Sequence, residues 1–216
     1  MVSDNRLQHD VLEELEFDPS VDHTRIGVTV KDGVVTLTGT TASYVEKLSA
    51  EAAARRVAGV RAIVESMEVH LPHAPPTGDG AIAKRIVDVF GWDSAIPKGI
   101  EVKVEDGWVT LTGEVDLHCQ SEAASQAAAR IEGVCGVTNL VLVRGQPSSG
   151  DIHSHIAAAF RRSADVDASK IQVAVDGGTV TLSGRTRTFH ERAMAQHAAW
   201  TAPGVTKVED KIVLAG

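Results

Sequence analysis

The chain has 216 residues, of which 43% are hydrophobic, 23% charged and only 4% aromatic, and its formal net charge is −8 at pH 7. No apolar run approaches the roughly 18 to 20 residues that a membrane-spanning helix needs, and the polar start of the chain lacks the apolar stretch of a signal peptide. We therefore expect a globular protein of the cytoplasm as the sequence is written, or of the periplasm only if a leader has been removed.

The charge is unevenly shared along the chain. Up to residue 71 there are 12 acidic and 7 basic residues, residues 79–144 hold 10 and 6, and the chain from residue 151 holds 7 and 8. Acidic surfaces repel anionic partners such as nucleic acid and lipid headgroups, so only the last third is suited to them. Basic and stacking residues do not interleave anywhere, and we expect no nucleic-acid partner.

The first predicted element is an amphipathic helix from about residue 7, because apolar residues recur there every three or four positions. Strict alternation of β-branched and polar residues over 26–30 then predicts a strand with one buried face. Asp32 and Gly33 form a hairpin signal before a second strand over 34–38.

A second helix with a face of small residues follows. That face consists of Ala50, Ala53, Ala54 and Val57. Their spacing of i, i+3, i+4 and i+7 predicts a helix that lies close against a sheet and tolerates added bulk poorly. Glu46, one turn earlier, is interpreted as a solvated side chain, as are Gln120 and Glu191 at the same place in the repeats described next. A last strand over 60–69 cannot form a hairpin with the second strand across a helix, and we place it in parallel beside the first.

This series of elements occurs three times, because residues 26–71 recur without a gap at an offset of 74 and again at an offset of 145. We expect three domains, at 1–71, 79–144 and 150–216, joined by Pro/Gly/Ser-rich linkers at 71–78 and 145–150. The glycines that recur at the turn, at the strand end and after the second helix are interpreted as structural. They are Gly33, Gly39 and Gly59; Gly107, Gly113 and Gly133; Gly178, Gly184 and Gly204.

The order helix–strand–strand–helix–strand predicts an α+β fold, in which each unit has a three-stranded mixed sheet covered on one face by two helices. The motif I-x-V-x-V-x-D-G-x-V-T-L-x-G, followed by a helix that ends in V-x-G-V, resembles the BON domain of bacterial proteins. The resemblance covers nearly the whole chain outside the linkers. It implies no active site and no cofactor, attachment to phospholipid membranes, and in some members a chaperone-like role in osmotic stress or potassium sensing. Because the motif consists of glycines and core aliphatic residues, it transfers no binding residue.

No candidate catalytic or metal site recurs at equivalent positions of the repeats, and we expect neither an enzyme nor a bound metal. His153 and His155 point to different faces of a helix. Cys119 and Cys135 lie at opposite ends of a predicted helix, too far apart for a disulfide bond, and are interpreted as ordinary thiols.

A candidate patch for an anionic surface lies in the third repeat. Arg185 and Arg187 are two residues apart and are expected to face the same way, while Arg192 follows them and Arg161 and Arg162 end the first helix. Such a patch can hold an anionic headgroup or an acidic surface. The alternative is that these arginines pair with the acidic repeats or are solvated.

Two tryptophans of the second repeat are also candidates for contacts. Trp92 is interpreted as packing in a core or between units, with membrane insertion as the alternative. Trp108 replaces Val34 and Thr179 of the other repeats and is interpreted as a contact between units.

Three functions therefore remain open. The favoured one is a stress-related, non-enzymatic protein that makes multivalent weak contacts with phospholipid headgroups or protein surfaces. The second is a soluble chaperone or scaffold that binds polypeptides through sheet edges. The third is a sensor of a small ligand or of potassium. The sequence does not predict the oligomeric state.

Overall fold

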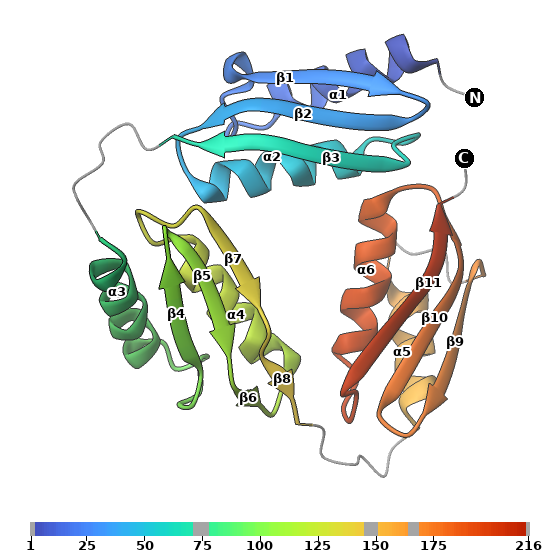
Figure 1. Cartoon of the computed structure of the whole chain (residues 1–216). Coiled ribbons are helices and arrows are strands. Elements are labelled where there is room, and N and C mark those ends of the chain that lie inside the picture. The colour runs from blue at the N-terminus through green and yellow to red at the C-terminus, as the bar shows by residue number, and fades with distance from the viewer. Residues whose placement is uncertain (1–2, 71–77, 145–150, 164–168, 215–216) are drawn as a thin grey trace. The chain divides into compact units, whose positions relative to one another are not determined.

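The computed structural model describes residues 3–70, 78–144, 151–163 and 169–214, so both predicted linkers fall almost entirely outside it. Each repeat contains a sheet of three strands with two helices on one face (Figure 1). The predicted α+β fold in repeated units is confirmed.

The first repeat begins with a helix whose first residue, Asp4, also binds the backbone of the hairpin turn. Its elements are α1 (Asp4–Phe17), a 3-10 turn (His23–Arg25), β1 (Ile26–Lys31), β2 (Val34–Thr41), α2 (Tyr44–Arg56) and β3 (Ala62–Val69). Asp32 and Gly33 have φ angles of 53° and 77°, as a type I′ turn requires. The carboxylate of Asp4 accepts hydrogen bonds from the backbone N–H groups of both, at 2.9 and 3.1 Å.

The second repeat has the same order, with two of its strands interrupted. Its elements are α3 (Asp79–Trp92), β4 (Glu101–Glu105), β5 (Trp108–Thr112), β6 (Glu114–Val115), α4 (His118–Ala129), β7 (Gly136–Asn139) and β8 (Leu142–Val143). Gly113, with a φ of 124°, separates β5 from β6. The backbone N–H of Leu142 donates to the carbonyl of Gly113 at 2.9 Å, so the strands continue to pair across the interruption.

The third repeat has continuous strands. Its elements are α5 (Ile152–Arg162), β9 (Ile171–Asp176), β10 (Thr179–Thr186), α6 (Phe189–Trp200) and β11 (Lys207–Leu214). Asp151 caps α5 by accepting a hydrogen bond from the N–H of Ser154 at 3.1 Å. Asp151 is not the counterpart of Asp4 and Asp79, whose carboxylates bind the hairpin turns of the other repeats, because at an offset of 145 it corresponds to Arg6.

The second strand, and not the first, is the partner of the last strand. The sheet orders are β1-β2-β3, β4-β5-β7 and β9-β10-β11, and β10 pairs antiparallel with β9 and parallel with β11. The prediction that the last strand lies beside the first is therefore wrong. A helix of 12 or 13 residues between the two strands is long enough to return the chain beside the strand that it has just left.

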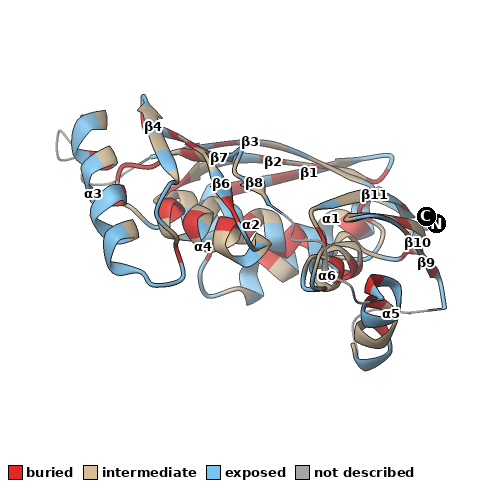
Figure 2. Cartoon of the chain, turned by 90° about the horizontal axis from the view of Figure 1, so that it is seen from below, coloured by how far each residue is buried: buried red, intermediate tan, exposed pale blue. Residues whose placement is uncertain are grey.

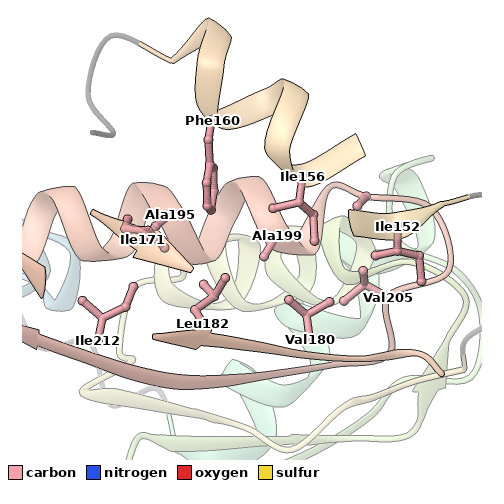
Figure 3. Packing of buried hydrophobic residues seen from close by; sticks show 11 residues of the cluster. Ile152, Ile156, Phe160, Ile171, Val180, Leu182, Ala195, Ala199, Val205 and Ile212 are labelled. Atoms are coloured by element: carbon pink, nitrogen blue, oxygen red, sulfur yellow. The ribbon is translucent and has the colours of Figure 1, made fainter. Parts of the chain in front are cut away.

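The core of each repeat lies between the sheet and the alanine face of its second helix. Ala50, Ala53 and Ala54 are all fully buried, which confirms the predicted close approach, and Figure 2 shows buried stripes along the helices. In the third repeat, side chains of α5 and α6 point toward those of the strands (Figure 3). This cluster includes Ile152, Ile156, Phe160, Val180, Leu182, Ala195, Ala199 and Ile212.

Candidate functional site

The acidic or amide residue that recurs near the start of the second helix is a capping residue. Glu46 and Glu191 are only 9% and 7% exposed, so their interpretation as solvated side chains is wrong. Glu46 accepts a hydrogen bond from the N–H of Ala42 at 2.6 Å, and Glu191 accepts one from the N–H of Arg187 at 2.7 Å. Both side chains satisfy backbone donors that would otherwise be left without a partner at the helix start.

In the second repeat an uncharged side chain, that of Gln120, caps the start of the second helix. Gln120 accepts hydrogen bonds from the N–H groups of Asp116 and Leu117 at 3.1 and 3.0 Å. Since an uncharged amide replaces the carboxylate, this position requires an acceptor and not an ionised group. Helix capping therefore explains why Glu46 and Glu191 are buried, and no catalytic role is needed to explain it.

A second recurring polar position links the second helix to the last strand, and sequence reasoning missed it. In the second repeat the amide of Asn139 donates to the hydroxyl of Ser121 at 2.8 Å. The equivalent pair in the third repeat is an ion pair between Arg192 and Asp210. Asn139 and Asp210 each also accept a hydrogen bond from the backbone N–H two residues later.

The first repeat places Lys47 and Glu65 at these two positions. The ammonium of Lys47 donates to the carbonyl of Met67 on β3 at 2.8 Å. The position is therefore polar in every repeat but differs in charge from one to the next. It could have been noticed in the sequence, because these residues interrupt the apolar pattern of the last strand at the same register.

The five arginines of the predicted patch lie in four different settings. Arg192 is ion-paired with Asp210 on the helix-covered side of the sheet, with 31% of its side chain exposed. Arg161 and Arg162 are exposed at the end of α5. Arg185 is exposed on β10 opposite Val213, and alternation with the buried Thr186 places it on the side of the sheet away from the helices. Arg187 is exposed immediately after that strand.

The glycine predicted at the end of the second strand lies inside β2 and β10 and between β5 and β6, so the pairing continues past it in every repeat. Gly39, Gly113 and Gly184 have φ angles of 116°, 124° and 130°. A Cβ on Gly39 or Gly184 would lie 2.0 Å from the carbonyl oxygen of Arg25 or Lys170 respectively. Only glycine fits such a conformation with backbone so near, and the position has a structural task.

The tryptophans of the second repeat lie outside its core. Trp92 is 91% exposed at the end of α3, so it does not pack in the core, and its packing between units stays a prediction. Trp108 is 50% exposed, and its ring lies so near Gly136 of β7 that a Cβ there would be 2.5 Å from it. Its ring N–H donates to the hydroxyl of Thr138 at 2.8 Å.

The carboxyl groups whose pKa values are lowered lie at helix ends, in turns and on a sheet surface. The pKa values of Asp18, Asp22 and Asp151 are lowered, in each case first by a hydrogen bond from a nearby hydroxyl, that of Ser20, Thr24 or Ser154. The pKa of Glu209 is lowered first by its hydrogen bond with Lys207. None of these groups lies in an enclosed polar pocket; each is on a described helix end, turn or sheet surface.

Within the described ranges, no three side chains of the His, Cys, Asp and Glu type gather as they would to hold a metal ion. Cys119 is exposed and Cys135 half-buried, and both are free thiols. No helix of the same ranges combines the length and the apolar character needed to cross a membrane.

Comparison with known proteins identifies the repeated unit. Residues 3–70, 78–145 and 148–216 each match the BON domain. The osmotically-inducible protein Y of Escherichia coli (strain K12) is 31% identical over 129 residues, which are 55% of this chain and 64% of that protein. The match therefore spans less than two thirds of the relative's length.

Two solved structures show a weaker likeness. CdsD, a structural protein of the type III secretion system of Chlamydia trachomatis, is 16% identical, with 96% of this chain and 91% of that chain covered and a TM-score of 0.26. The PrgH periplasmic domain is 12% identical, with 95% and 100% covered and a TM-score of 0.22. Scores this low support no conclusion about shared fold or function.

Proposed function

This chain belongs to the BON-domain family, with one domain in each repeat, and on that basis we propose that it is a stress-related binding protein without enzymatic activity. The name of its osmotically-inducible relative supports the link with stress. The observation that supports the proposal most directly is that the residues shared by the three repeats have structural roles. They cap helices, close turns and fill cores, so recognition falls to surfaces that differ among the three copies.

The surface that we propose for recognition is the uncovered face of the third sheet. Arg185 of β10 and Lys207 and Lys211 of β11 alternate onto that face, with Glu209 between the two lysines. The repeats differ at these positions: Ala62 and Ser66 replace the lysines in the first repeat, and Glu114 replaces Arg185 in the second. A basic face on one domain of an acidic chain suits an anionic surface, of which a phospholipid membrane is our leading candidate.

Vesicle flotation tests this proposal. At low salt the full chain is expected to float with vesicles that contain phosphatidylglycerol and not with neutral phosphatidylcholine vesicles, and added salt should reverse the binding. Arg185→Glu with Arg187→Glu should abolish flotation. The control Lys84→Glu with Arg85→Glu makes the same change of charge on the exposed face of α3 and should float normally. Absence of lipid-dependent flotation at low salt would refute the membrane as partner.

A second candidate function, polypeptide binding, is favoured by exposed apolar residues of the second repeat. Trp108, Leu140 and Leu142 are 50%, 56% and 64% exposed on β5, at the end of β7 and on β8. A strand that is hydrogen-bonded to only one other strand can pair with an extended polypeptide, and exposed apolar side chains beside it can contact the side chains of that polypeptide. Suppression of the aggregation of an unfolded client, lost in Leu140→Ser with Leu142→Ser but retained in Arg185→Glu with Arg187→Glu, would support this candidate over membrane binding.

A further inference from the structure

The third repeat has a groove between its two helices. It has a volume of about 260 Å³ and lies between α5 and the end of α6. Its apolar wall is formed by four small side chains, those of Ala158, Ala159, Ala198 and Ala202, and its rim carries His155 and Arg162. The groove is therefore an apolar recess with basic groups beside it.

The same place in the first repeat has the opposite character. It is lined by Asp10, Glu13, Glu14, Glu16, Phe17 and Val57. The guanidinium of Arg56 donates to one of these carboxylates, that of Glu14, at 2.6 Å and to Asp18 at 3.2 Å. Phe17, the last residue of α1, is 85% exposed and stands out from this acidic surface.

Equivalent positions show that the two surfaces are inverted copies of each other. At an offset of 145, Asp10 corresponds to His155, Glu14 to Ala159 and Glu16 to Arg161. Phe17 corresponds to Arg162 in the same way. Alanine in place of glutamate makes the wall of the third repeat's groove apolar, and basic residues in place of acidic ones reverse the charge of its rim. One surface thus presents an aromatic side chain among carboxylates, and the other presents a small apolar recess among cations.

We propose that these surfaces bind each other between two copies of the chain. The ring of Phe17 from one copy occupies the alanine-lined groove of the third repeat of the next copy. The carboxylates of Asp10 and Glu16 then face Arg161, Arg162 and His155. An aromatic ring that fills a pocket surrounded by complementary charges is the usual composition of an energetic centre in a protein interface.

The geometry of this contact determines how many copies of the chain can assemble through it. The Phe17 surface and the alanine-lined groove are different surfaces of the same copy, so the contact joins unlike surfaces and can add further copies in a chain or close into a ring. The contact area around a single ring is small, and such contacts are weak and transient. Association is therefore expected only at high protein concentration and low salt, and it does not depend on the proposed binding of membranes.

Sedimentation velocity with the full chain tests the proposal. At low salt and up to about 0.5 mM protein, the weight-average sedimentation coefficient of the wild type should rise with concentration, and high salt should return it to the monomer value. Phe17→Ala should weaken association by about tenfold or more, as truncation of a central aromatic residue does. Arg161→Glu with Arg162→Glu should prevent it through repulsion of the acidic surface.

A mixing experiment isolates the pairing of unlike surfaces. The Phe17→Ala variant retains the groove, and the Arg161→Glu, Arg162→Glu variant retains the aromatic surface. At a concentration at which the wild type associates, each variant alone should be mostly monomeric, whereas an equimolar mixture should form a one-to-one complex that grows no further. Trp92→Ala removes the exposed aromatic side chain at the corresponding helix end of the second repeat and should leave wild-type association unchanged.

Each opposite result overturns the proposal. A wild type that stays at the monomer sedimentation coefficient at low salt and high concentration shows that the contact does not form between copies. Association of wild-type strength in Phe17→Ala, or association that is lost in Trp92→Ala, shows that another surface is responsible. A mixture of the two defective variants that remains monomeric shows that Phe17 and the groove are not partners.

Discussion

Replacing Thr41 or Thr186 with valine is expected to stabilise the protein. These threonines occupy equivalent positions at the ends of β2 and β10 and are 0% and 1% exposed. Their hydroxyl oxygens have no hydrogen-bond partner among the described residues. The second repeat has Val115 at this position, 3% exposed, which shows that the fold accommodates a methyl group in place of the hydroxyl.

The size of the effect follows from the cost of burying an unpaired hydroxyl. That cost is about 1 to 3 kcal/mol, and valine removes it while keeping nearly the same shape. We expect Thr41→Val to raise the free energy of unfolding of the first repeat by about 1 to 2 kcal/mol. Val115→Thr should lower that of the second repeat by a similar amount.

Native-state hydrogen exchange of the full chain resolves these changes repeat by repeat. In Thr41→Val the slowest amides of the first repeat should exchange about 5 to 30 times more slowly, with the other repeats unchanged. Thr29→Val, on the exposed face of β1, is a matched control and should have little effect. Faster exchange in Thr41→Val, or no change in Val115→Thr, would show that these hydroxyls have a partner and that the reasoning is wrong.

Three further outcomes are expected. Gly39→Ala should cost at least about 2 kcal/mol, because of its positive φ and the nearby carbonyl, whereas Gly80→Ala in open space on α3 should be neutral or stabilising in the same thermal unfolding assay. Gly136→Ala should destabilise the second repeat by about 1 kcal/mol or more through its contact with the ring of Trp108, and adding Trp108→Val should restore the stability in a double-mutant cycle. The pKa of Asp18 is lowered from its ordinary value of 3.8, so this carboxylate stabilises the fold at pH values above 3.8, and the stabilisation is lost as the pH falls through the lowered pKa of the folded state. Asp18→Asn should therefore make the stability of the first repeat depend less on pH on the acid side. An unchanged pH dependence would exclude that contribution.

The elements and their order could be predicted because their signals are local. Alternation over 26–30, the Asp-Gly turn and the alanine face of the second helix each determine the conformation of nearby residues. The strand order could not be predicted in this way, since both edges of the first hairpin were open to the last strand. The length of the helix between β2 and β3 was the available signal, because it suits a crossover to the adjacent position.

The polar residues were harder to interpret than the apolar ones. Ser43 followed by Glu46, and Thr188 followed by Glu191, have the spacing of a capping box, so these caps were readable from the sequence. Arg192 can pair with Asp210 only if the face of β11 that carries Asp210 packs against α6. The spacing of residues in the sequence does not predict which face does so. The spacing therefore predicts one patch with both Arg185 and Arg192, although the structure exposes the first on the open face of the sheet and pairs the second, on α6, with Asp210 of β11.

The central claim, that the shared residues build the scaffold and a surface of one copy performs recognition, is tested most directly by amide chemical shifts. We expect nanodiscs that contain phosphatidylglycerol to shift the amide signals of β10 and β11 around Arg185 and Lys211, and to leave the equivalent strands of the first two repeats unchanged. Shifts that instead recur at equivalent positions of all three repeats, centred on the recurring caps and buried polar pairs, would contradict the account.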